Sequence, residues 1–321
     1  MSYSKRYVAE NDLLTLINQQ YAIKGEKIRL YRDMMGSVFF VQTSSGRKVF
    51  KLYRPNASER AIQTTHVIPY LSSCGYPVVQ IIPAISGALY ITVERPEGNC
   101  VGILFDYAFG ICIWTLEKGD GWVMNPLTRE FSKSVGHMHR LMEQHDQPLI
   151  HRGTEYYFER LVWILRRDNY DEAKVYDLET YGNELRHVLE KLPTGFCHGD
   201  PHAGNTKYRG GQFTWMDFDN ASISYPMLDI GWMIETSYVV FKKESFERSR
   251  RVFEEVYAGY TTERTLTDGE VAACFHSVAI MHFGSIVQTA LMGHEYYTRR
   301  ILDREHDWLM RWRECCSKSV L

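Results

Sequence analysis

Two neighbouring stretches decide the fold of this chain: His198-Gly199-Asp200-Pro201-His202-Ala203-Gly204-Asn205 and, after a Gly210-Gly211 turn, Trp215-Met216-Asp217-Phe218-Asp219. The first stretch reads as a loop that presents one carboxylate and one amide. The second reads as a strand that ends in two more carboxylates. The glycine pair between them predicts a hairpin, which brings the strand ends together. We therefore expect Asp200, Asn205 and Asp217 to converge on one point.

Three oxygen-bearing side chains without a cysteine suit a hard cation such as Mg²⁺. Phosphoryl transfer requires such a set, because a base must orient and deprotonate the acceptor hydroxyl while oxygen ligands hold magnesium on the phosphates. The kinase pattern is a catalytic-loop Asp, an Asn five residues later and a downstream Asp-Phe. Asp200, Asn205 and Asp217-Phe218 reproduce this pattern.

These residues resemble the aminoglycoside phosphotransferase and choline kinase-like superfamily, which includes homoserine, choline and methylthioribose kinases. The resemblance rests on Phe196 to Asn205, on Met216 to Asp219 and on Asp229-Ile230-Gly231. Asp217 to Ala221 is also similar to a bacterial stress-response protein kinase of the same superfamily. The resemblance covers nearly the whole chain, although the N-terminal part matches only loosely. It implies an α+β, two-lobed protein kinase-like fold, with a small β-rich N-lobe and a larger, mainly helical C-lobe.

The resemblance also implies roles for individual residues. Asp200 would be the catalytic base, and Asn205 and Asp217 would bind Mg²⁺ beside ATP. Asp229 would brace the catalytic loop, and the alternative is that it caps the N-terminus of the helix that follows. His198 is expected to fix the loop by hydrogen bonding to backbone or to Asp217.

The nucleotide site is expected in the N-terminal lobe. By the resemblance, Lys51 contacts the α- and β-phosphates, with Lys48 as the competing candidate. Gly36 and Ser37, together with Met35, would form the turn that covers the phosphates. Phe105 to Tyr107 would form the hinge whose backbone binds adenine.

The acidic partner of Lys51 stays open. In the family a helix glutamate usually pairs with this lysine, but Thr64 occupies roughly its place and Glu59 lies about one turn earlier. This gap leaves room for a second hypothesis, a pseudokinase that binds nucleotide without turnover.

The pattern of the remaining chain agrees with two lobes, at 1–107 and 108–321. Val38 to Val41 and Lys48 to Tyr53 predict a β-hairpin, and Ser58 to Ser73 predicts a helix that Pro69 is expected to kink. Further strands are expected at 78–83, 89–93 and 101–107. Helices are expected around 131–142, at 156–167 and 181–192, and over most of the chain after Met227.

The acceptor is the least determined part of the site. A small hydroxyl compound such as an amino alcohol, a sugar or an aminoglycoside is the first hypothesis, and a protein serine or threonine is the alternative. Asp219 replaces the glycine that many relatives carry after Asp-Phe, so it is a candidate to bind a further metal ion or a cationic substrate. Trp232 and Glu235 lie one helical turn apart and are candidates to line the acceptor pocket. The string of His198, Asp200 and His202 also raises a zinc hydrolase, although no second His or Cys cluster completes such a site.

Composition excludes several other classes of protein. The formal net charge of −2 over 321 residues argues against a general nucleic-acid binder. No stretch approaches the roughly 20 apolar residues of a membrane span, and the N-terminus lacks the apolar region of a secretion signal. The seven scattered cysteines contain no C-x-x-C pair, which is typical of a reduced, cytoplasmic protein.

Overall fold

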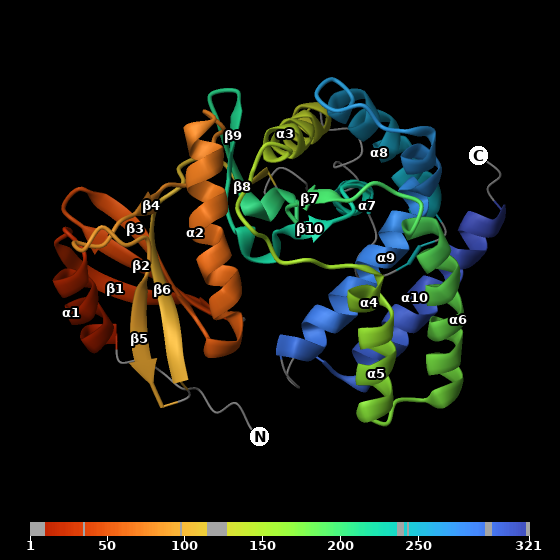
Figure 1. Ribbon diagram of the computed structural model, residues 1–321, viewed down its shortest axis with the longest axis horizontal. Helices are drawn as coiled ribbons and strands as arrows, with labels where there is room; N and C mark the ends of the chain where they lie inside the picture. Colours follow the sequence, from red (N-terminus) through yellow and green to blue (C-terminus); the bar gives the residue numbers. More distant parts are fainter. Residues whose placement is uncertain are drawn as a thin grey trace. The chain divides into compact units, whose positions relative to one another are not determined.

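The computed structural model describes residues 10–34, 36–96, 98–113, 127–235, 241–242, 244–292 and 297–318. The chain forms two compact units. The first comprises Met1–Cys112 and Asn205–Asn220, and the second comprises Ile113–Gly204 and Ala221–Leu321. The first unit is built on a small antiparallel sheet and the second is mainly helical (Figure 1), so the predicted α+β, kinase-like class is confirmed.

The first unit contains a six-stranded antiparallel sheet in the order β1-β2-β3-β6-β4, with β5 also paired to β6. The predicted hairpin is present, and its register places Phe39 opposite Phe50. The strands have the following bounds: β1 Gly25–Asp33, β2 Gly36–Thr43, β3 Gly46–Tyr53, β4 Ile81–Ile82, β5 Ile91–Arg95 and β6 Gly98–Asp106.

Alternation along these strands separates a core face from a functional face. Phe50 and Leu52 on β3 are buried in one hydrophobic cluster with Leu13 and Ile17 of α1 (Glu10–Gln20). Lys51 lies between them in sequence, so its side chain points to the other face of the sheet. That is the side on which α2 (Ser58–Ser73) lies, whereas α1 lies on the opposite side (Figure 1). Pro69 does not interrupt α2, which continues to Ser73.

A second hairpin, β8 (Thr206–Arg209) and β9 (Gln212–Trp215), belongs to the first unit although it lies far along the chain. Val79 N–H donates to the Trp215 carbonyl at 2.9 Å, and Ile111 bridges to Tyr208. These backbone hydrogen bonds tie 205–220 to the sheet unit, so the division differs from the predicted 1–107 and 108–321. The turn requires its glycines, because Gly210 and Gly211 have φ angles of 58° and 82°.

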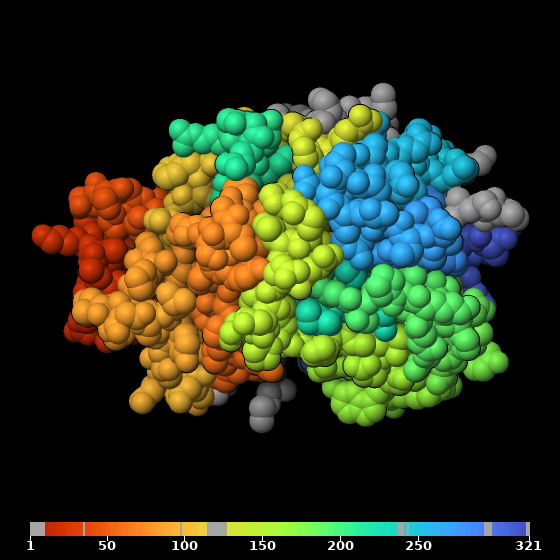
Figure 2. All heavy atoms as spheres, turned by 45° about the horizontal axis from the view of Figure 1, so that its top comes forward, coloured from red at the N-terminus to blue at the C-terminus, as the bar shows by residue number. Residues whose placement is uncertain are grey.

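Helices dominate the second unit, together with the two-stranded pair β7 (Gly195–Cys197) and β10 (Ser222–Ser224). The helix predicted at 156–167 is divided at Phe158, and the one predicted at 181–192 begins nine residues earlier, at Glu172. In Figure 2 the green segment of α6 lies beside the blue segments of the later helices at the surface of this unit. The helices are α3 Leu127–Met142, α4 Thr154–Tyr157, α5 Glu159–Arg167, α6 Glu172–Leu189, α7 Met227–Ile234, α8 Ser245–Tyr260, α9 Asp268–Met292 and α10 Arg299–Lys318.

One of these helices, α9, corrects an expectation from the sequence. Its residues Asp268–Leu291 are long and apolar enough to cross a membrane, with a mean hydropathy of 1.4. However, 83% of the most apolar part of this helix is buried inside the protein, and the helix packs against α4, α5, α6, α7 and α10. Its high hydropathy therefore has the ordinary explanation of a core helix that is surrounded by others.

Candidate active site

Lys51 lies at the centre of an ionic cluster in the first unit. Its Nζ is 2.8 Å from Asp217 Oδ1 and 2.6 Å from Asp219 Oδ2. The Tyr53 hydroxyl donates to the other oxygen of Asp219 at 2.9 Å, and Lys51 Nζ lies 4.9 Å from the centre of the Tyr53 ring. The open question about the partner of Lys51 is thereby answered: two aspartates after β9 provide the negative charge.

The members of this cluster strongly affect one another's protonation. Burial by itself lowers the pKa of the Lys51 ammonium, but Asp217 and Asp219 together raise it well above its usual value. Burial, assisted by the Asp217 charge, raises the pKa of the Asp219 carboxyl to about 6 against the opposing effect of Lys51. Burial also raises the pKa of the Tyr53 phenol, so this side chain is a hydrogen-bond donor at neutral pH.

Of the three residues predicted to converge, Asn205 and Asp217 are brought together by the β8–β9 hairpin, whereas Asp200 belongs to the second unit. Thr206 pairs with Trp215, and Met216 N–H donates to the Asn205 carbonyl at 3.0 Å, so both residues lie at the same end of the hairpin. Asp217 has a φ angle of 64°, in the left-handed region that non-glycine residues rarely adopt. Such strain is common at functional sites, where it aims a side chain. The Asp217 side chain is 39% exposed and remains accessible to a ligand.

The predicted phosphate-covering turn lies between β1 and β2. Gly36 begins β2, and a Cβ at this position would come within 2.8 Å of the Leu52 carbonyl oxygen, so glycine is needed for this close approach. The Ser37 hydroxyl donates to Asp33 across the turn at 3.0 Å. Met35 lies outside the described residues.

The predicted hinge lies at the end of β6. Phe105 is buried and pairs with Val49 and Ile81, while Asp106 N–H donates to the Gln80 carbonyl at 2.9 Å. Tyr107 follows the strand end, with its ring 6.0 Å from Phe40. Lys48, the competitor of Lys51, forms an ion pair with Asp106 at this end of the sheet.

In the second unit, Asp229 holds the loop that carries Asp200. Its carboxylate accepts hydrogen bonds from His198 N–H at 2.6 Å and from Gly199 N–H at 2.9 Å. His139 Nε2 is 2.9 Å from Asp229 Oδ2. Since a carboxylate can only accept, His139 carries its proton on Nε2, and in the neutral ring Nδ1 accepts from the Tyr260 hydroxyl at 2.7 Å.

This geometry matches the bracing role, whereas the alternative of a helix cap is wrong. Pro226 occupies the N-cap of α7, and Asp229 lies within the first turn with its side chain directed to the loop. His198 is fully buried, and its backbone amide is one of the bonds to Asp229.

Asp200 has a neighbour that orients it. His202 Nε2 lies 3.5 Å from Asp200 Oδ2, and His202 Nδ1 accepts from Gly204 N–H at 3.0 Å. Because Nδ1 is an acceptor, the ring proton lies on Nε2 and faces the Asp200 carboxylate. The Asp200 side chain is 24% exposed.

The candidate acceptor residues belong to different units. Asp219 is buried in the first unit, where its two oxygens contact Lys51 and Tyr53. Trp232 and Glu235 belong to the second unit, at the end of α7. The Trp232 ring lies 6.5 Å from the His202 ring, and its side chain lines a cavity next to Gly199.

The zinc alternative finds no support. Within the described ranges, no group of three or more His, Cys, Asp or Glu side chains is arranged to hold a metal ion. His202 instead interacts with Asp200 and with backbone.

Sequence reasoning missed Tyr53 and His139. Tyr53 lies two residues after Lys51 on β3, so strand alternation places both side chains on one face and could have suggested it. His139 lies 90 residues before Asp229, and no local pattern connects the two.

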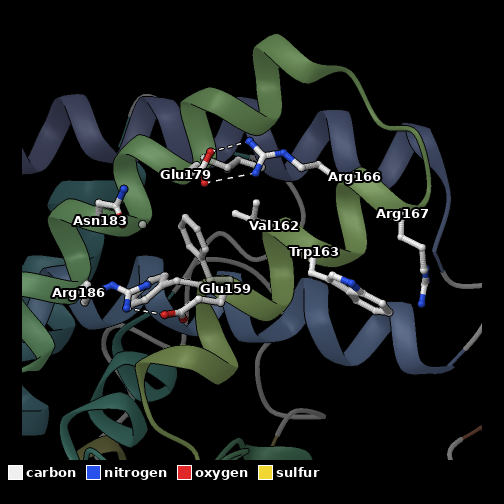
Figure 3. A pocket seen from close by; sticks show the side chains of 12 residues that line it. Glu159, Val162, Trp163, Arg166, Arg167, Glu179, Asn183 and Arg186 are labelled. Atoms are coloured by element: carbon white, nitrogen blue, oxygen red, sulfur yellow. Dashed lines mark hydrogen bonds and ion pairs between the residues drawn. The ribbon is translucent and has the colours of Figure 1, made fainter.

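Described residues of the second unit line a larger and a smaller cavity. The larger, of about 660 Å³, lies between α5, α6 and α9, and the charged side chains around it form ion pairs, including that of Arg167 with Asp168. Figure 3 shows Arg186 joined to Glu159, and Arg166 joined to Glu179. The smaller, of about 30 Å³, lies beside the catalytic loop and is lined by Gly199, Arg152 and Trp232 among others. The smaller cavity therefore adjoins the candidate catalytic residues.

Comparison with known structures shows the fold. The chain is similar to the amicoumacin kinase hAmiN in complex with AMP-PNP, Ca²⁺ and Ami, with 18% identity and a TM-score of 0.73 over 96% of this chain and 93% of that one. It is similar to the microcompartment-associated aminopropanol kinase, with 15% identity and a TM-score of 0.67 over 97% and 100%. A spectinomycin phosphotransferase in complex with ADP and spectinomycin gives 14% identity and a TM-score of 0.63 over 95% of each chain.

The sequence itself shows the family. No curated protein matches it significantly. The sequence model described as the phosphotransferase enzyme family matches residues 29–266, which is most of the chain and includes Lys51, the catalytic loop and Asp229. The chain therefore belongs to the phosphotransferase enzyme family and is a phosphotransferase with a kinase-like fold.

Proposed function

We propose that this protein transfers the γ-phosphate of ATP to a hydroxyl group of a small molecule. The observation that carries the proposal is the cluster in the first unit. Lys51, a largely but not fully buried lysine on β3, contacts Asp217, and Asp217 shares the end of a hairpin with Asn205. Phosphoryl transfer depends on positioning and on charge stabilisation, and these residues provide a fixed cation together with oxygen ligands.

Asn205 and Asp217 fit Mg²⁺ as its protein ligands. Their amide and carboxylate oxygens are hard donors, and Asp217 remains partly exposed. The Asp217 carboxylate already holds one positive group, because the Lys51 ammonium lies 2.8 Å from its Oδ1. When bound, Mg²⁺ would neutralise the charge that develops on the phosphates.

The residues of the chain then have the following roles. Asp200 accepts the proton of the acceptor hydroxyl while the oxygen of that hydroxyl bonds to the γ-phosphorus. The bond between the γ-phosphorus and the β,γ-bridging oxygen breaks, which releases ADP. The proton on Asp200 subsequently passes to solvent. His202 orients Asp200 through its Nε2 proton, and Asp229 holds the loop through two backbone amides. Lys51 neutralises charge on the nucleotide phosphates.

The Lys51 cluster also bears on the pseudokinase alternative. That alternative was raised because no helix glutamate pairs with the lysine. Thr64, at the expected place, donates its hydroxyl to the Arg60 carbonyl within α2. Asp219 supplies a carboxylate to the lysine from another part of the chain, which supports the enzyme rather than the pseudokinase hypothesis.

The proposed acceptor is an amino alcohol, a sugar or an aminoglycoside-like compound. Support comes from proteins of the same fold, namely an amicoumacin kinase, an aminopropanol kinase and a spectinomycin phosphotransferase. A protein serine or threonine remains the second candidate. We place the activity in the cytoplasm, because all seven cysteines are free, as expected under reducing conditions.

The proposal is tested by Mg–ATP binding and by ADP release with a panel of hydroxyl compounds, in the wild type and in Asp200→Asn. The amide keeps the shape of the side chain but cannot accept a proton, so we expect turnover to fall about 10²- to 10⁴-fold while the Kd for ATP stays within about twofold. Asp168→Asn, an exchange at a surface ion pair of the same unit, is the control. Transfer at the wild-type rate in Asp200→Asn would refute the assigned base, and ATP binding without any transfer in the wild type would identify a pseudokinase.

A further inference from the structure

Arg152 is a buried cation without an anionic partner. The residue is 5% exposed, and within the described part of the chain its guanidinium forms no ion pair or side-chain hydrogen bond. The Arg152 Cζ lies over the face of the Tyr156 ring, 4.9 Å from the ring centre. A charged group buried in this way costs free energy unless a counter-charge is supplied, so its retention points to a ligand.

The backbone fixes Arg152 in this position. Arg152 N–H donates to the Ile223 carbonyl at 2.9 Å, and its own carbonyl accepts from the Ser224 hydroxyl at 2.8 Å. The preceding residue, His151, forms a parallel bridge to Ile223. The segment thus extends the β7–β10 pair, and the arginine is held before any ligand arrives, which lowers the cost of binding.

The Arg152 side chain lines the cavity of about 30 Å³ beside the catalytic loop. Gly199, the neighbour of Asp200, and Trp232 line the same cavity. Tyr156 lines the same cavity, and its hydroxyl is buried without a hydrogen-bond partner in the described ranges. Arg160 lies over the same Tyr156 ring at 5.7 Å, so the tyrosine lies close to two cations.

Asp229 also lines the cavity, but its oxygens are already engaged. They accept from the His198 and Gly199 amides and from His139, and no ion pair joins Asp229 to Arg152. Asp229 is therefore not a hydrogen-bond partner of the Arg152 guanidinium.

The size of the cavity limits what can enter. A water molecule needs about 10–15 Å³ on this scale, so the space accepts about two water-sized groups. Two such groups correspond to the two oxygens of a carboxylate, whereas a phosphate with its four oxygens is too large. A planar guanidinium also matches a carboxylate in a bidentate arrangement.

We infer that the hydroxyl acceptor carries a carboxylate, and that Arg152 and Tyr156 bind this carboxylate in the cavity beside Gly199. The inference rests on the proposed phosphotransfer at Asp200 and narrows its substrate to hydroxy acids, with or without an amino group. A carboxylate held next to Gly199 keeps its attached chain near the catalytic loop.

The experiment compares matched acceptors in the wild type, Arg152→Gln and Arg152→Lys. The hydroxy acids 3-hydroxypropanoate and 4-hydroxybutanoate are paired with 1,3-propanediol and 1,4-butanediol, and ADP release is measured. We expect the wild type to prefer the acids. Arg152→Gln should lower kcat/KM for the acids roughly 10- to 100-fold, mainly through KM, because a charge-assisted hydrogen bond is lost. In Arg152→Gln, kcat/KM for the diols and the KM for ATP should change less than about threefold. Arg152→Lys should restore part of the lost kcat/KM for the acids.

Tyr156→Phe provides a milder variant that keeps the ring under Arg152, and it should lower kcat/KM for the acids about threefold to tenfold. Wild-type turnover of diols as efficient as that of the acids would overturn the inference while leaving the proposed function intact. So would an equal loss for acids and diols in Arg152→Gln.

A binding measurement separates this inference from the failure of the proposed function. Absence of transfer to every acceptor in the wild type would refute the function, and the cavity is then tested by thermal unfolding with acetate and with neutral acetamide at matched ionic strength. Acetate should raise the Tm of the wild type but not that of Arg152→Gln, and acetamide should raise neither. No acetate-dependent shift in the wild type would overturn the carboxylate site.

Discussion

Asp219 and Asp229 are both buried aspartates, 6% and 0% exposed, yet they are stabilised in different ways. Asp219, in the first unit, faces the Lys51 ammonium and the Tyr53 hydroxyl. Asp229, in the second unit, faces two backbone amides and the His139 ring. The partners of Asp219 are side chains on β3, whereas two of the three partners of Asp229 belong to the backbone of the loop that it holds.

The difference separates a functional charge from a structural one. The Lys51 ammonium also contacts Asp217. Under the proposed function it would exchange partners when phosphates approach, so we expect the environment of Asp219 to respond to the nucleotide. Backbone amides cannot be exchanged in this way, so Asp229 fixes the catalytic loop whether or not a ligand is present. We expect stability to depend on Asp229 and nucleotide binding to depend on Asp219.

The largest effect is expected for Asp229→Ala. This change leaves the His198 and Gly199 amides and His139 without their acceptor, and each buried, unsatisfied group costs about 1–3 kcal/mol. The free energy of unfolding, measured by urea titration at pH 7, should fall by more than about 3 kcal/mol. Glu254→Ala, at an exposed position on α8, should change it by less than about 0.5 kcal/mol. A loss below about 1 kcal/mol for Asp229→Ala would show that the loop does not depend on this carboxylate.

A smaller and different effect is expected for Asp219→Asn. The amide cannot supply the charge that holds Lys51, which is then left with Asp217, the proposed magnesium ligand. The Kd for Mg–ATP, measured by calorimetric titration, should rise about tenfold, while the free energy of unfolding at pH 7 changes by about 1 kcal/mol or less. Asp12→Asn, at an exposed position on α1, serves as the control and should leave both quantities unchanged. Unchanged ATP affinity together with a large loss of stability in Asp219→Asn would remove the distinction between the two aspartates.

The smallest effect is a pH dependence that belongs to Asp219. Burial raises the folded-state pKa of this carboxyl to about 6, above the unfolded value of 3.8, so the protonated form is favoured by folding. Its contribution to stability is fully present below the unfolded pKa and is lost as the pH rises through about 6. The wild type should therefore gain stability relative to Asp219→Asn between pH 7 and pH 5, by about 1 kcal/mol.

That difference is measured by parallel urea titrations of the two proteins at pH 7, 6 and 5. Taking the difference cancels other groups that titrate equally in both. A change of opposite sign would mean that the Lys51 ammonium outweighs burial and holds Asp219 ionised.

Local spacing was enough to predict the chemistry and much of the first unit. The Gly210-Gly211 turn and the residues around it predicted that Asn205 and Asp217 would lie at one end of a hairpin, and the register of β8 and β9 agrees. The alternation of Lys48 to Tyr53 likewise predicted β3 and its hairpin partner. These features depend on turn geometry and on the two-residue period of a strand, both of which are written in adjacent residues.

Long-range pairing was decided only by the tertiary structure. Lys51 and Asp217 lie 166 residues apart. No local sequence pattern therefore shows that the lysine contacts Asp217 and Asp219 rather than a helix glutamate. The same holds for His139, which is 90 residues from Asp229, and for Arg152, for which the described elements around it supply no anionic partner. The β8–β9 hairpin joined the first unit for the same reason, because its backbone hydrogen bonds go to Val79 and Ile111 rather than to its neighbours in sequence. The sequence determines which side chains are available and which of them are local neighbours. Packing determines which distant side chains come into contact, because a buried charge is stabilised only by the partners that the fold places beside it.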